Sequence, residues 1–185
     1  TMHIDSGSLH KIMTKTSFAG ALLREADLEG TNLAGVDLQG ADLQDANLQG
    51  ANLDSANLSF ANLWGANLHQ AHLNETNLKR ADLRWSILNE ADLEKSDLKE
   101  ADLTSAQLRK TNLRGAILKW ADLNGASLNE ADLTGADMFR SNLVRTQMTG
   151  TILNAANMSL TNMMEANLTN ADLTGTTLHD AVVSN

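Results

Sequence analysis

The residues of this sequence whose types and spacing could carry out chemistry are one closely spaced pair of histidines and many carboxylates. His69 and His72 are three residues apart, a spacing that would place both imidazoles on one face of a helix, where they could bind a metal ion. The 23 aspartates and glutamates could supply a carboxylate pair for general acid–base catalysis. The sequence contains no cysteine, so thiolate metal sites and disulfides are excluded.

Whether these residues can meet depends on the elements that carry them, and the sequence repeats every five residues. From Thr16 to Asn185 it divides into 34 consecutive pentapeptides without a break. The third position is Leu in 28 of them and otherwise Phe, Met or Val, and the first is always Ala, Thr, Ser or Val. The second position is Asp or Asn in 23 repeats, and 11 of the 12 glycines occupy the fifth. Such a period identifies a repeat architecture.

A period of five matches neither a helix nor a continuous strand. Positions one to three can alternate inward, outward and inward as in a strand, which leaves positions four and five to turn the chain. The glycines support a type II turn, because its third residue has a positive φ. Aspartate and asparagine beside such turns can accept hydrogen bonds from nearby backbone amides. The pattern therefore predicts a chain wound into a tube, with the third-position side chains filling its axis.

The run of A-D/N-L-x-x units, as in "ADLQDANLQGANL", resembles the pentapeptide-repeat proteins. The resemblance implies an all-β fold, a right-handed quadrilateral β-helix (solenoid) with one pentapeptide per side and about 8.5 coils over residues 16–185. At ladder spacing the rod would be about 40 Å long. Residues 1–15 fall outside the repeat. They are either an N-terminal cap, formed with Ile4, Leu9, Ile12 and Met13, or a leader or tag remnant.

The repeat removes the chemical candidates. His69 stands at the fourth position of one side and His72 at the second position of the next, so their side chains are expected to point in different directions. Most aspartates belong to the second-position column, where turn chemistry explains them. The glycines are spaced by turns and form no phosphate-binding loop. We therefore expect no catalytic site, no metal site and no cofactor, and a protein that is not an enzyme.

Large aromatic residues at positions that should face water are the strongest functional signal. We number the sides from first to fourth, beginning with residues 16–20; all three tryptophans and two of the three phenylalanines then fall on the first and second sides. Exposed Trp and Arg commonly dominate binding energy at interfaces. The alternative is that cation–π stacking along the rod is purely structural. The candidate protein-binding residues, called here the aromatic–basic stripe, are Phe60, Trp64, Arg80, Arg84, Trp85, Lys119, Trp120, Phe139 and Arg140.

The net charge and the hydropathy of the sequence limit which partners and which cellular compartment are expected. The net charge of −9 argues against nonspecific nucleic-acid binding and favours cationic partners. No apolar run is long enough to span a membrane, and no secretion signal opens the sequence. We expect a soluble protein that is cytoplasmic if the chain start is native, or exported to a periplasm or lumen if a signal was removed.

Two functional hypotheses follow. The first is a structural or protein-binding scaffold whose stripe or end docks a partner protein. The second, implied by the resemblance, is a DNA mimic that binds and inhibits a type II topoisomerase such as DNA gyrase. Members of that branch typically have Phe-rich centres, interrupting loops and a C-terminal dimer helix, whereas this array has Leu centres, no interruption and no helix. The first hypothesis is therefore preferred.

The last coil predicts an assembly. An uncovered ladder edge invites pairing with another chain, and two copies meeting about a two-fold axis would satisfy both edges. The predicted edge residues are Met163, Val182 and Val183. One coil offers little area, so a weak homodimer is expected.

Overall fold

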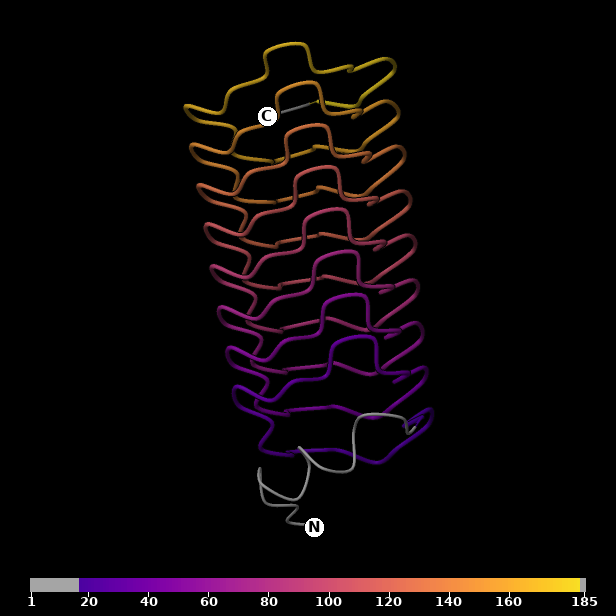
Figure 1. Cartoon of the computed structure of the whole chain (residues 1–185). Helices are drawn as coiled ribbons and strands as arrows, with labels where there is room; N and C mark the ends of the chain where they lie inside the picture. The colour runs from indigo at the N-terminus through magenta and orange to yellow at the C-terminus, as the bar shows by residue number, and fades with distance from the viewer. Residues whose placement is uncertain (1–16, 184–185) are drawn as a thin grey trace.

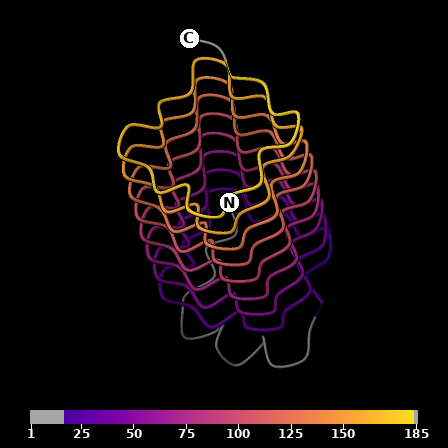
Figure 2. The ribbon, with the colours of Figure 1, turned by 90° about the horizontal axis from the view of Figure 1, so that it is seen from above.

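The chain winds into stacked coils of 20 residues in the computed structural model, which describes residues 17–183 (Figure 1). Parallel β-bridges join each second-position residue to the one 20 residues later, from Leu22 with Asp42 to Asn162 with Val182. Each bridge is a single residue long, and residues 17–183 contain no helix. Seen from above, the successive coils lie over one another (Figure 2). The predicted right-handed quadrilateral β-helix is confirmed.

Three backbone hydrogen bonds on each side of a coil hold the stack together. On one side, for example, Leu88 N–H donates to the Gln107 carbonyl at 2.7 Å and Ile87 N–H to the Ala66 carbonyl at 2.9 Å. The fifth-position amide of Glu90 adds a third bond to the next coil at 2.9 Å. Because these bonds recur in every interior coil, buried backbone groups are paired without any long strand.

The corners are the predicted turns, but glycine is not required for them. At one corner Ala91 N–H donates to the Leu88 carbonyl at 3.1 Å, which closes a four-residue turn. Every fifth-position residue from Gly20 to Asp180 has a positive φ, between 53° and 71°, and 22 of these residues are not glycine. The ladder bonds therefore impose a left-handed backbone on side chains that rarely adopt it.

The second-position residues support the turns as expected. The Asp92 carboxylate accepts a hydrogen bond from Glu94 N–H at 3.2 Å and another, at 2.8 Å, from the side-chain amide of Asn112 one coil further on. The same residue thus fixes a turn and links two coils. This structural role accounts for the abundance of Asp and Asn.

The core is the continuous stack of third-position side chains. Leucines from Leu28 to Leu153 are at most 1 % exposed, and the first-position alanines between them are equally buried. Threonine in the first position is accommodated because its hydroxyl finds a carbonyl, as Thr111 Oγ1 does with the Leu88 carbonyl at 2.8 Å.

The uppermost coil is more open than the rest. Leu173, Leu178, Val182 and Val183 are 37–65 % exposed, whereas Met163 is 2 % exposed and lies beneath the final turn of chain. The predicted edge therefore rests on Val182 and Val183 rather than on Met163. The predicted leader or cap, residues 1–15, lies outside the described residues.

Replacing Gly135 by alanine is expected to lower the free energy of unfolding by about 1 kcal/mol, because an alanine at a φ of 68° is strained. A β-carbon at Gly135 would meet no atom within 4 Å, so the cost is purely conformational. Ala155, one coil further along the same column, already has a φ of 55°. Ala155→Gly should therefore change stability in the opposite direction by a similar amount. Urea titration of both variants measures this, and a change of the same sign in both would contradict it.

Candidate protein-binding stripe

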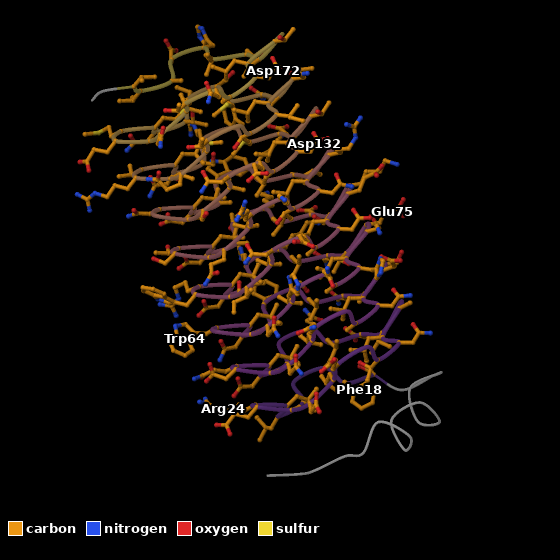
Figure 3. The ribbon with its side chains drawn as sticks, turned by 90° about the vertical axis from the view of Figure 1, so that its left-hand side faces the viewer. Phe18, Arg24, Trp64, Glu75, Asp132 and Asp172 are labelled. Carbon is orange, nitrogen blue, oxygen red and sulfur yellow. The ribbon has the colours of Figure 1, made fainter. Side chains whose placement is uncertain are left out.

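The aromatic residues of the stripe lie at the corners beside the second side. Phe60, Trp85 and Trp120 stand at fifth positions and are 54 %, 59 % and 43 % exposed. Trp64 and Phe139 stand at fourth positions. Both were expected to face water, but each is half-buried. Figure 3 shows Trp64 projecting from the edge of the rod that also carries Arg24, opposite the edge of Glu75, Asp132 and Asp172.

The backbone holds the three exposed aromatic residues in an unfavourable conformation. Phe60, Trp85 and Trp120 have φ values of 61°, 61° and 57°, in the left-handed region. Ladder bonds fix them there, as between Trp120 N–H and the Phe139 carbonyl at 3.0 Å. Each such residue costs about 1–2 kcal/mol relative to a right-handed one. Glycine, which fills 11 of the described fifth positions, avoids that cost.

The N-terminal half of the stripe is a stack of an aromatic ring, a cation and a carboxylate. The guanidinium of Arg80 lies 5.7 Å from the centre of the Phe60 ring. Its Nε donates to a Glu100 carboxylate oxygen at 2.6 Å, and this hydrogen bond lowers the pKa of Glu100. These three residues occupy one corner in consecutive coils, so their contacts arise only from the 20-residue alignment.

The C-terminal half is centred on two aromatic rings. Trp120 and Phe139 meet edge to face, with their centres 6.0 Å apart and an interplanar angle of 89°. The Lys99 ammonium lies 4.9 Å from the Trp120 ring centre, and the Arg140 guanidinium lies 5.5 Å from that of Phe139. Such arrangements stabilise a surface and also present rigid, amphipathic contact area to a partner.

Most cations of the stripe are engaged by carboxylates. Arg84 Nη2 is 2.5 Å from a carboxylate oxygen of Asp82, and this hydrogen bond lowers the pKa of Asp82 and raises that of Arg84. Lys119 Nζ is 2.9 Å from a carboxylate oxygen of Asp137. The first side carries five Lys and Arg against five Asp and Glu, whereas each of the other three sides has an excess of acids. The stripe residues of the first side thus lie where basic and acidic residues are equal in number.

The two candidate histidines each make a contact within the rod. His69 Nδ1 is 2.8 Å from the backbone carbonyl oxygen of Asn89, one coil away, and the exposed His72 bridges Asn52 and Asp92 within the ladder. In residues 17–183 no three His, Cys, Asp or Glu side chains are grouped to hold a metal ion. The same range contains no helix long and apolar enough to cross a membrane. The side-chain interactions on this part of the rod are aromatic stacking, cation–π contacts and ion pairs.

The stripe residues and cation–π stacking along the rod were predicted from the sequence, but two of the pairs were not. Trp120 and Phe139 are 19 residues apart, and Lys99 and Trp120 are 21 apart. Both pairs join neighbouring coils, so the 20-residue coil implied by the family resemblance was the signal that could have found them. It was also not predicted that, among residues 17–183, Arg140 has no carboxylate oxygen within 4.0 Å.

The repeat pattern has direct counterparts among known proteins. The family model described as "Pentapeptide repeats (8 copies)" matches residues 12–50, 51–89, 76–115, 116–154 and 141–180, which together span most of the chain. The chain belongs to the pentapeptide-repeat family. A search of curated proteins found no match to this pentapeptide-repeat protein.

Solved structures of other family members resemble it. HetL, a pentapeptide repeat protein involved in heterocyst differentiation regulation from the cyanobacterium Nostoc sp. strain PCC 7120, is 33 % identical, with 98 % of this chain and 94 % of HetL covered and a TM-score of 0.40. A pentapeptide repeat protein of the Arabidopsis thaliana thylakoid lumen is 25 % identical, covers 60 % of this chain and 77 % of its own, and has a TM-score of 0.57. QnrB1, a plasmid-mediated fluoroquinolone resistance protein, is 19 % identical over 86 % of this chain and 90 % of its own, with a TM-score of 0.45.

Proposed function

We propose that this pentapeptide-repeat protein is a non-enzymatic scaffold that docks a partner protein through the aromatic–basic stripe. The observation that carries the proposal is the exposure of three large aromatic side chains, Phe60, Trp85 and Trp120, at the two corners that border one side of the rod. Large apolar residues gathered on the surface of a protein mark interaction sites more often than isolated ones do.

The energetics favour a binding role. The three residues are held at positive φ, where glycine would be less strained, so their side chains weaken the fold unless contacts offset the strain. Interface energy is concentrated in Trp, Tyr and Arg, and rigid aromatic groups lose little conformational entropy on binding. The first side, without the net negative charge of the other three, would also repel an acidic partner least.

A pull-down from the source organism tests the proposal by comparing the wild type with a variant in which Trp64, Trp85 and Trp120 are all changed to alanine. We expect at least one partner recovered by the wild type to be lost. The control is Ile152→Ala, which removes an exposed apolar side chain from the fourth side and should leave recovery unchanged. Circular dichroism must show that each variant remains folded. Equal recovery of every partner by the triple variant would refute the stripe.

A gyrase supercoiling assay separates this proposal from the DNA-mimic alternative. Inhibition by micromolar protein would overturn our preference. QnrB1 is only 19 % identical to this chain, so its likeness does not favour the DNA-mimic alternative.

We also propose that two copies associate weakly through the C-terminal coil, where Val182 and Val183 are 51 % and 65 % exposed. Among the described residues, the amides of Leu168, Leu173 and Leu178 find no backbone acceptor in a following coil, and a second copy could supply one. Light scattering over a concentration series tests this. A monomer at every concentration, or a dimer that persists in Val183→Lys, would show that this edge is not the joint.

A further inference from the structure

Arg140 differs from every other cation that the structure describes. Of the twelve lysines and arginines within residues 17–183, eleven have a nitrogen within 4.0 Å of a carboxylate oxygen, and Arg140 is the exception. The chain has nine more acidic than basic residues, so a nearby carboxylate is the norm on this rod. An exposed guanidinium without one is therefore a local departure.

Three large apolar side chains neighbour Arg140. Its corner column continues with Trp120 in the coil before it and Leu160 in the coil after it, which are 43 % and 36 % exposed. Phe139 lies beside it, 5.5 Å from ring centre to guanidinium carbon, and Trp120 in turn braces Phe139 edge to face. The guanidinium is thus held over an aromatic surface with its donors available.

Such a site is complementary to a carboxylate flanked by apolar groups. A guanidinium binds a carboxylate through two parallel hydrogen bonds, and the pair strengthens when apolar groups exclude water around it. Trp120 and Leu160 supply apolar contact on either side of that pair. A partner suited to the column therefore presents an apolar residue, an acidic residue and a second apolar residue in line.

The spacing of the coils indicates whether that partner presents these residues from a helix or from a strand. Neighbouring rungs of a β-ladder are about 4.8 Å apart, so Trp120, Arg140 and Leu160 span about 9.6 Å. On one face of a helix, residues i and i+7 are about 10.5 Å apart along the axis, with i+3 or i+4 midway. In an extended strand, residues on one face recur about every 6.7 Å, which accumulates a mismatch of about 4 Å over two steps. A helix lying along the rod matches the column, and a strand does not.

We propose that the column of Trp120, Arg140 and Leu160 binds one helix of a partner protein, oriented along the rod, which presents apolar, acidic and apolar side chains at positions i, i+3 or i+4, and i+7. The acidic residue pairs with Arg140, and the apolar residues contact Trp120 and Leu160. This inference rests on the proposed protein-binding function and specifies the partner's chemistry.

A displayed library of single helices with randomised surface positions, selected on the full chain, tests the inference. We expect enriched sequences to carry Asp or Glu between two large apolar residues at that spacing. Arg140→Gln should weaken the selected helices at least about tenfold, since an interfacial charge pair of this kind contributes about 1.4 kcal/mol or more. Arg140→Lys, which keeps the charge, should restore part of the binding.

Arg145→Gln is the matched control, at a residue outside the stripe. Arg145 also occupies an exposed fifth position and has a φ of 58° against 57° for Arg140, but it is already paired with Glu165. Its substitution should leave the selected helices bound. Equal loss in both variants, selection without an acidic residue, or no selection at all would overturn the inference.

The outcomes separate the inference from the proposed function. Recovery of a natural partner could require Trp120 and yet be unchanged by Arg140→Gln. In that case the stripe would still be a docking surface, but the inference of an acidic helix would be wrong. Light scattering adds one further outcome: if Arg140→Gln converts a dimer to a monomer, the occupant is a second copy of this chain and the inference is wrong.

Discussion

Replacing Leu88 by alanine is expected to lower the free energy of unfolding by about 2–5 kcal/mol. Leu88 is fully buried in the axial stack, so its truncation leaves a cavity inside the rod. The wall around the cavity would be fixed by ladder bonds, since the Leu88 amide and carbonyl bond to Gln107 and Thr111 in the following coils. A rigid wall relaxes little, which places the cost toward the upper part of that range.

Denaturant titration followed by circular dichroism measures this loss. Leu22→Ala is the control, because it makes the same chemical change at a second-position side chain that is 83 % exposed. The control should alter stability by less than about 0.5 kcal/mol. A loss below about 1 kcal/mol for Leu88→Ala would show that the axial stack is not the main source of stability.

Deleting the single residue Asn124 is expected to abolish the single cooperative unfolding transition. Asn124 is a corner residue, and the alignment of residues 105–123 with the following coil would change from 20 residues to 19. A one-residue slip exchanges inward and outward side chains, so aspartates and asparagines would face leucines across the break. A coil interface in this fold contains four buried leucines, each contributing about 1.5–3 kcal/mol, so the expected loss exceeds about 5 kcal/mol.

A deletion of one whole coil, residues 91–110, is the matched control. It removes twenty times as many residues but keeps every column aligned, so a shorter rod with one unfolding transition is expected. Hydrogen exchange should show protection on both sides of this junction and a loss of protection beside the Asn124 deletion. If the Asn124 deletion retained one transition with less than about 1 kcal/mol lost, coil alignment would not control the fold.

The sequence by itself determined the wall of the rod. Leu at the third position, a small residue at the first and Asp or Asn at the second are local rules, because each repeat must turn its side chains inward or outward within five residues. The burial of the leucines and the positive φ at each corner followed from this pattern. The exclusion of catalysis was likewise a prediction from the pattern, since the repeat explains most of the aspartates.

The tertiary structure alone decided which side chains stack on one another. The contacts of Lys99 with Trp120, of Trp120 with Phe139, and of Arg80 with Glu100 join residues 19 to 21 apart, and no residue-level rule brings them together. The unpaired state of Arg140 likewise depends on its neighbours in the adjacent coils. The physical reason is that a five-residue period fixes the geometry of one side, whereas the number of sides that closes a coil, and hence every column on the surface, depends on how the whole chain packs around its core.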